Sequence, residues 1–195
     1  MFRIQEWDDL DADRTGFFPH SFDTDFGYER IANVVYHTPL ILLTDNGSTS
    51  YVGHRSAKDL VDEEVIVEKE PDETRKKNLV EHILSMGFFH FRIKKYIEIR
   101  VADSVPIDRA LGYAALLKGI VYSERNLNLL ENELSDIDNI DKIQDAVIKI
   151  ETNGFDAVIY LNMTAADWAM RLIQLASKAL SGKDKEYLKC VRSWA

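Results

Sequence analysis

The chain has 195 residues, of which 46% are hydrophobic and 29% are charged, and its formal net charge is −9. This composition is typical of a folded globular protein of one ordinary domain or two small ones, and the acidic balance argues against general nucleic-acid or anionic-membrane binding, which needs a basic surface. The single cysteine, Cys190, excludes an internal disulfide and any multi-cysteine metal site.

Residues 1–25 are rich in Asp, Gly, Pro and aromatic residues and show no clear period, so they predict an ordered loop region. The opening letters MFRIQEWDDLDADR are acidic where a signal peptide needs a basic start and an apolar stretch. No apolar run approaches the roughly 20 residues that span a bilayer. We therefore expect a cytoplasmic protein, in agreement with the single cysteine.

Two local patterns follow in residues 28–56. Apolar residues at helical spacing predict a short helix over residues 28–36. Residues 39–53 (PLILLTDNGSTSYVG) predict a β-hairpin, because Asn46 and Gly47 supply the positive φ angles that a tight two-residue turn requires.

The next stretch leads from a charged segment into a strand. Residues 61–77 are the most charged part of the chain and predict a surface connection. Helical spacing over residues 79–86 predicts a second helix, which Gly87 ends. A long strand with many β-branched residues is expected over residues 89–102.

The predicted strand carries two different faces, because successive side chains of a strand point to opposite sides. Its odd positions are apolar apart from one lysine, which predicts a face packed on a core. The even positions present polar groups, namely His90, Arg92, Lys94, Tyr96, Glu98 and Arg100. Glu98 and Arg100 would lie about 7 Å apart along the strand, which suits two groups that reach one polyanionic ligand. An ordinary solvated sheet face is the alternative explanation of the same alternation.

From residue 106 onward the pattern is helical. The predicted helices cover residues 106–124, 140–150, 165–180 and 183–191. We therefore expect an α+β fold with a strand-containing half, 1–105, and a helical half, 106–195, packed on it in one structural domain.

Two blocks of this sequence resemble one known family. The segment FRIKKYIEIRVADSVP resembles the part of glutamate–cysteine ligases in which an arginine-lysine strand leads into a Tyr-x-Glu-x-Arg-x-x-Asp motif. The earlier segment EWDDLDADRTGFFPHSFDTDFGYERIANVVYHTPLIL resembles the Asp-x-Asp-Arg-x-Gly and Phe-Gly-Tyr-Glu-Arg region of the same family, closest to the plant and proteobacterial type. The two blocks occur in the family's order and together cover roughly Glu6 to Glu124.

The resemblance implies an ATP-dependent ligase that joins the γ-carboxylate of glutamate to the amine of cysteine through γ-glutamyl phosphate, the first step of glutathione synthesis. It also implies a curved, mainly antiparallel sheet like that of glutamine synthetase, with Mg²⁺ and nucleotide on its concave face. By the motif match, Glu98 would be a Mg²⁺ ligand and Arg100 would be the catalytic residue that stabilises the transferring phosphoryl group. Arg92 and Lys94 would bind substrate carboxylates or phosphates, and Arg14 matches a family arginine of the substrate site.

Full members of that family are about twice as long, and their N-terminal half supplies further glutamates of the metal cluster. We therefore expect this chain to correspond to the C-terminal half of such a ligase. Three possibilities stay open: part of an active enzyme, formed through a homodimer or a complementing N-terminal half; an assembly partner for that half; and a catalytically silent module that binds nucleotide or amino acid.

Other motifs give weaker indications. Asp9, Asp11 and Asp13 resemble the start of a Ca²⁺-binding loop, but Arg14 and His20 stand where that loop needs Gly and Glu. The histidines show no paired metal-ligand spacing. Neither a P-loop nor a glycine-rich dinucleotide motif occurs.

Overall fold

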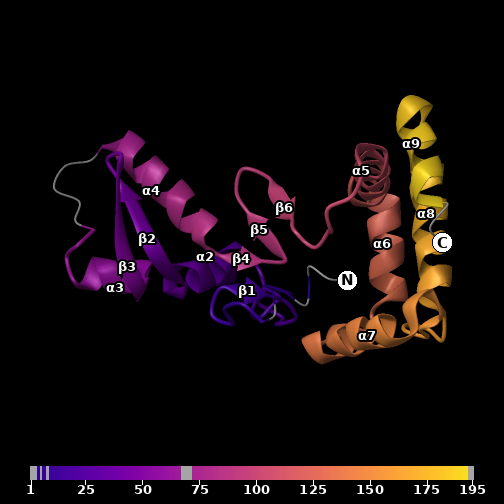
Figure 1. Cartoon of the computed structure of the whole chain (residues 1–195), viewed down its shortest axis with the longest axis horizontal. Helices are drawn as coiled ribbons and strands as arrows, with labels where there is room; N and C mark the ends of the chain where they lie inside the picture. Colours follow the sequence, from indigo (N-terminus) through magenta and orange to yellow (C-terminus); the bar gives the residue numbers. More distant parts are fainter. Residues whose placement is uncertain (1–3, 5, 8, 67–71, 193–195) are drawn as a thin grey trace. The chain divides into compact units, whose positions relative to one another are not determined.

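A computed structural model describes residues 4, 6–7, 9–66 and 72–192. The chain divides into two compact units, Met1–Asp103 and Ser104–Ala195, and each unit is described by itself (Figure 1). A mixed α+β architecture with a mainly helical C-terminal region is confirmed. The packing of residues 106–195 on residues 1–105 stays a prediction.

The first unit combines helices with short strands. Its helices include α2 (Tyr28–His37), α3 (Ala57–Asp62) and α4 (Glu73–Met86). Its strands are β1 (Thr15–Gly16), β2 (Pro39–Asp45), β3 (Ser48–Ser56), β4 (Phe88–Phe89), β5 (Phe91–Ile93) and β6 (Ile97–Ile99). The predicted helix at residues 28–36, the hairpin at 39–53 and the helix that Gly87 ends are confirmed.

Local side-chain chemistry explains where these elements begin and turn. Asn46 and Gly47 connect β2 to β3 with φ angles of 49° and 75°, as a tight hairpin turn requires. The Asp72 side chain accepts hydrogen bonds from the first backbone N–H groups of α4. The expectation of a surface connection over residues 61–77 is therefore wrong at its ends, because α3 reaches Asp62 and α4 begins at Glu73. Residues 67–71 of that segment lie outside the described residues.

The strands form small sheets. Among the described residues there are three two-stranded sheets: β1–β4 is parallel, while β2–β3 and β5–β6 are antiparallel. This part of the chain shows no single curved sheet of the kind that the resemblance implies.

The strand expected over residues 89–102 is instead broken into β4 and the β5–β6 hairpin, which is a correction to the prediction. The chain reverses over residues 94–96, where the backbone N–H of Lys94 donates to the carbonyl of Tyr96. The prediction that the odd positions pack on a core is confirmed for β5 and wrong for β6. Phe91 and Ile93 of β5 pack against a buried cluster, but Ile97 and Ile99 of β6 are 62% and 40% exposed. The reversal carries β6 out of that cluster.

Two apolar cores support the first unit. One lies among the β2–β3 hairpin, α3 and α4, with Leu40 and Leu60 almost fully buried. The other is centred on Phe18, whose ring lies 4.9 Å from Phe89 and 5.1 Å from Phe91 between ring centroids. Burying a phenylalanine side chain contributes about 1.5–3 kcal/mol. This second core therefore fixes the N-terminal segment against β4 and β5.

The second unit is helical. It contains α5 (Ile107–Val121), α6 (Glu124–Glu133), α7 (Ile140–Asn153), the short 3₁₀ helix η1 (Gly154–Asp156), α8 (Ala165–Ala179) and α9 (Gly182–Arg192). Helices α5, α7, α8 and α9 confirm the predictions, and α6 was not predicted. A Cβ placed on Gly119 of α5 would lie 2.6 Å from the Cβ of Ala176 on α8, so these two helices pack closely at that point. Within the described ranges, no helix combines the length and apolar character needed to cross a membrane.

Candidate functional site

The β5–β6 hairpin brings three of the predicted site residues together. Arg92 and Glu98 are direct cross-strand partners, and Arg100 follows two residues after Glu98. The Arg92 Nε donates to Glu98 Oε2 at 2.9 Å, and Arg92 Nη2 donates to Glu98 Oε1 at 3.1 Å. Arg100 Nη1 donates to the same Oε1 at 2.6 Å. We call these three residues the arginine–glutamate cluster.

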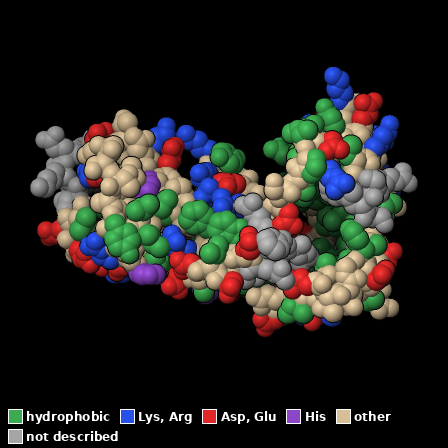
Figure 2. Space-filling view, viewed as in Figure 1, with side chains coloured by type: hydrophobic (Ala, Val, Ile, Leu, Met, Phe, Trp, Pro, Cys, Tyr) green, Lys and Arg blue, Asp and Glu red, His purple; other side chains and the backbone are tan. Residues whose placement is uncertain are grey.

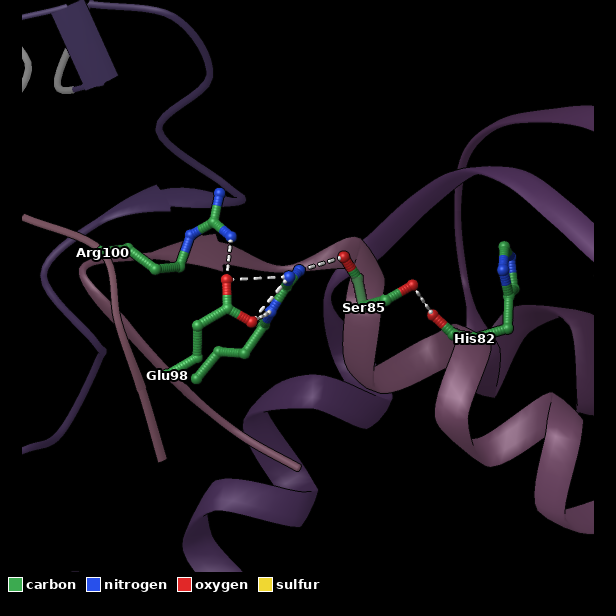
Figure 3. A network of polar contacts seen from close by, with 5 residues as sticks. His82, Ser85, Glu98 and Arg100 are labelled. Carbon is green, nitrogen blue, oxygen red and sulfur yellow. Dashed lines mark hydrogen bonds and ion pairs between the residues drawn. The ribbon is translucent and has the colours of Figure 1, made fainter. Parts of the chain in front are cut away.

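The cluster is anchored to the end of α4. Arg92 Nη1 donates to the backbone carbonyl of Ser85 at 2.7 Å, and the Ser85 hydroxyl donates to the carbonyl of His82. Figure 3 shows Glu98 and Arg100 pointing toward each other, with Ser85 and His82 following on the neighbouring helix. The side chains of Arg92 and Arg100 are only 13% and 11% exposed, whereas Glu98 is 26% exposed. The two guanidinium groups are therefore held in fixed positions.

Aromatic rings hold Arg100 from another side. Its guanidinium carbon lies 5.3 Å from the ring centroid of Trp7 and 5.3 Å from that of Phe88, within the range of cation–π attraction. Trp7 and Phe88 stack on each other at 5.6 Å. The Arg100 Nε is buried and has no hydrogen-bond partner among the described residues.

Arg14 lies beside Phe88, one ring of this aromatic pair. Parallel pairing of β1 with β4 sets Thr15 opposite Phe88, so that the guanidinium carbon of Arg14 lies 5.6 Å from the Phe88 ring. Arg14 Nε donates to Asp11 Oδ2 at 2.9 Å. The structure therefore brings Arg14 and Arg100 to one aromatic ring, although they are far apart in the sequence.

Lys94 lies apart from the cluster. Its backbone belongs to the hairpin turn, and no hydrogen bond or ion pair between described residues joins its side chain to Arg92, Glu98 or Arg100. It lines instead a groove beside α4.

Charge and burial shift the pKa of the Glu98 carboxyl in opposite directions. Burial raises the pKa of the Glu98 carboxyl, but the hydrogen bonds and positive charges of Arg92 and Arg100 outweigh it, so the pKa lies below its ordinary value. The carboxyl is therefore ionised at neutral pH. Two guanidinium groups and one carboxylate leave the cluster with a net positive charge, which favours an anion as its ligand.

The arginine–glutamate cluster alone provides few ligands for a metal ion. The described residues contain no group of three or more His, Cys, Asp or Glu side chains that could hold one. Mg²⁺ is usually bound by one or two carboxylates together with substrate phosphates and water. Glu98 has the chemistry of such a ligand, but both of its oxygens already accept hydrogen bonds from arginine. Metal binding would require at least one of these bonds to be given up.

Three neighbours of the cluster were not predicted as functional: Trp7, Phe88 and Ser85. Trp7 and Phe88 are brought together by the two-residue pairing of β1 with β4 and by the Thr15 hydroxyl, which donates to the Trp7 carbonyl, and the sequence contains no recognisable signal for this arrangement. Ser85 acts through its backbone carbonyl, which any residue type would offer.

Comparisons with known proteins show the same family as the resemblance of the two sequence blocks. The profile of the family described as Glutamate-cysteine ligase family 2 (GCS2) matches residues 2–193. Glutamate–cysteine ligase A, chloroplastic, of Oryza sativa subsp. indica is 29% identical over 137 residues, which cover 70% of this chain and 27% of that protein. Glutamate–cysteine ligase, chloroplastic, of Brassica juncea is 31% identical over 123 residues, which cover 63% of this chain and 23% of that protein. The chain thus spans about a quarter of the length of the curated relatives it matches.

Proposed function

The chain belongs to glutamate-cysteine ligase family 2, and from this premise we propose that it supplies part of the active site of an ATP-dependent carboxylate–amine ligase. The reaction would join the γ-carboxylate of glutamate to the amine of cysteine through γ-glutamyl phosphate. The observation that carries the proposal is the arginine–glutamate cluster, which lies within the segment FRIKKYIEIRVADSVP that resembles the family's motif region.

The chemistry of phosphoryl transfer fits this cluster. Such reactions depend mainly on positioning and on neutralising negative charge with cationic groups held in place beforehand. Arg100 is held by Glu98 on one side and by Trp7 and Phe88 on the other, so it would meet the transferring phosphoryl group without reorganising. Arg92 would contribute charge to the same anion or to a substrate carboxylate. Arg14, which shares the ring of Phe88, would do so from the N-terminal segment.

In this proposal the chain supplies one ligand to the metal ion. Mg²⁺ bound with ATP would neutralise phosphate charge, and Glu98 is the ligand that this chain would supply. The other ligands would be phosphate oxygens, water and carboxylates of a second copy or of a complementing N-terminal half. Lys94 stays a proposed contact to a phosphate or a substrate carboxylate.

The proposal also includes the sheet and the packing of the helical residues in the assembled ligase. In the assembled ligase, β5 and β6 would be part of a curved antiparallel sheet, with residues 1–105 carrying the site and residues 106–195 packed on them. The cytoplasmic location stays a prediction, since the relatives named above are chloroplastic proteins.

A silent binding module is the second candidate function. Both Glu98 oxygens are paired with arginine, and this pairing favours the silent module. The resulting site suits the binding of an anion but offers a single carboxylate to a metal ion. The test is the release of ADP by the chain with Mg-ATP, glutamate and cysteine. Release that requires both amino acids and is abolished by Glu98→Gln would support the ligase. Binding of Mg-ATP without any release would support the silent module.

A further inference from the structure

A groove lies between α8 and α9, within the second unit. Its volume is about 400 Å³, in the range of small-molecule sites. Helix α8 lines it at helical spacing with residues 170, 173, 174, 177 and 178, and α9 lines it with residues 185, 188 and 189. The lined face of α8 is roughly 12 Å long, because an α-helix rises about 1.5 Å per residue. We call this site the α8–α9 groove.

The floor of the α8–α9 groove is apolar. Ile173 and Leu188 are only 5% and 4% exposed, and Leu188 packs in the buried core of the second unit with Ala115 and Ala176. Met170 is half-buried and lines the same groove. An unbranched apolar chain laid along this floor would lose contact with water and gain contact with these side chains.

The rim of the groove is cationic. Lys178, Lys185 and Lys189 line it and are exposed, and none of the three forms an ion pair with a described residue. No Asp or Glu is among the described residues that line the groove. Of the two acidic side chains of α9, Asp184 lies 2.6 Å from Lys118 Nζ and Glu186 does not line the groove. A positive potential therefore persists here, on a chain whose net charge is −9.

Helix chemistry accounts for only part of this charge. Lys178 lies in the last turn of α8, where a cation interacts favourably with the helix dipole. Lys185 lies in the first turn of α9, where the dipole disfavours a cation. The position of Lys185 thus works against the stability of α9 and adds to the attraction for an anion. Figure 2 shows Lys and Arg side chains beside hydrophobic ones at the upper right, where Figure 1 draws α9.

Two neutral polar side chains complete the lining. Gln174 and Ser177 line the groove, and neither side chain forms a hydrogen bond with a described residue. The amide and the hydroxyl add two donors to the three ammonium groups. Donors without acceptors of their own, above an apolar floor, suit a ligand with an anionic head and an apolar chain.

We propose that the α8–α9 groove binds a fatty acid, a carboxylate that carries an unbranched apolar chain. The carboxylate lies among the ammonium groups of the rim, and the chain lies along Met170, Ile173 and Leu188. The apolar floor favours this ligand over a polyanion, and the enclosure between two helices favours a single molecule over a lipid surface. The site goes beyond the proposed function, because it lies outside both ligase motifs and binding here requires neither nucleotide nor Mg²⁺.

The first test is calorimetric titration of the whole chain with decanoate below its micelle-forming concentration. Two charge-assisted contacts are lost in Lys185→Gln/Lys189→Gln, so decanoate affinity is expected to fall at least about tenfold. The matched control is Lys142→Gln/Lys149→Gln, which makes the same change in net charge on α7 and should bind decanoate as the unaltered chain does. Equal affinity in the two double variants, or no binding by the unaltered chain, would overturn the proposal.

The second test locates the ligand by the ¹³C-methyl NMR signals of the methionines. Decanoate should shift the signal of Met170, which Met170→Leu identifies by its loss, and should leave that of Met86 in the first unit unchanged. A shift of Met86 without one of Met170 would reject the α8–α9 groove and place decanoate elsewhere. Neither outcome depends on Mg-ATP, so the proposed function stands or falls separately.

Two further ligands separate the head from the chain. Butyrate has the same carboxylate on a shorter chain and should bind at least about tenfold more weakly than decanoate, because fewer methylene groups are buried. Decylammonium has the chain but a positive head and should not shift the Met170 signal. Equal binding of butyrate and decanoate would overturn the role of the floor. Binding to phosphatidylglycerol vesicles without any binding of decanoate would overturn the fatty-acid site in favour of a lipid surface.

Discussion

Arg92 and Glu98 face each other across the β5–β6 hairpin, and the guanidinium of Arg92 donates to both carboxylate oxygens of Glu98 at 2.9 and 3.1 Å. Arg100 adds a third hydrogen bond at 2.6 Å. A carboxylate shared by two largely buried guanidinium groups orients both of them, and it also keeps their charges from being buried without a partner.

Replacing Glu98 should therefore destabilise the first unit. Glu98→Gln removes the negative charge from between two arginines, and we expect a loss of about 1–3 kcal/mol in the free energy of unfolding. Urea denaturation followed by circular dichroism measures this loss. Glu133→Gln is the matched control, because Glu133 pairs with the single arginine Arg171 at similar exposure. A loss in Glu98→Gln no larger than in the control would contradict the orienting role.

The same pair predicts how stability depends on pH. The folded-state pKa of Glu98 lies below its ordinary value, so its stabilising contribution is fully present above the unfolded pKa and is lost as the pH falls through the folded pKa. The unaltered chain should therefore exceed Glu98→Gln in stability at pH 7, and the gap should close at pH values well below about 4.3, the ordinary pKa of glutamate. Urea midpoints between pH 7 and pH 3 measure the gap. A gap that stays constant over this range would refute the assignment.

Part of the site's arrangement follows from the sequence, although the strand that was expected to carry it is broken into β4 and the β5–β6 hairpin. Three residues, 94–96, make the reversal, and this odd number keeps Arg92, Glu98 and Arg100 on one face, as in a continuous strand. The reversal itself could not be predicted because residues 94–96 (Lys-Lys-Tyr) contain none of the Gly, Pro, Asn or Asp that mark turns. The sequence thus predicted that the three side chains share a face, but not that Arg92 lies beside Glu98, because a continuous strand would separate these two residues by about 20 Å.

A side-chain cap marks the start of α8, which was predicted correctly, whereas the capped starts of α3, α4 and α6 were not predicted. The Thr164 hydroxyl and the Asp167 carboxylate form a reciprocal cap at the start of α8, as their spacing predicts. Contacts between segments distant in sequence were not predictable in this way. The placing of Trp7 against Arg100 depends on the β1–β4 pairing and on the packing around Phe18, both of which are tertiary effects.

Phe88 should act as a positioning residue for the two arginines. Phe88→Leu keeps an apolar side chain but removes the ring that lies near both Arg14 and Arg100, so we expect Mg-ATP affinity to fall several-fold while the chain stays folded. Phe155→Leu, at an exposed position of the second unit, serves as the control. Calorimetric titration with Mg-ATP, together with a thermal melt, separates lost affinity from lost structure. Unchanged affinity in Phe88→Leu would show that the ring does not position Arg100 for the ligand.

The helical unit offers a test of its close packing. In Gly119→Ala the new methyl group would lie 2.6–2.9 Å from atoms of Ala176, so α5 and α8 would have to move apart. Overpacking of this kind costs about 1–3 kcal/mol, which exceeds the gain of up to about 1 kcal/mol in helix propensity. The melting temperature of Gly119→Ala should therefore fall. A rise in that temperature would mean that the two helices are not in contact there.

The central claim is that Arg100, held between Glu98 and two aromatic rings, binds the phosphate of a nucleotide substrate. The most direct measurement is calorimetric titration of the chain with Mg-ATP in the presence of glutamate, comparing Arg100→Gln with Arg171→Gln. Both variants remove one arginine that pairs with a glutamate. We predict that Arg100→Gln binds at least about tenfold more weakly than the unaltered chain and that Arg171→Gln binds equally well. Equal binding by all three proteins, or no binding by the unaltered chain, would contradict the claim.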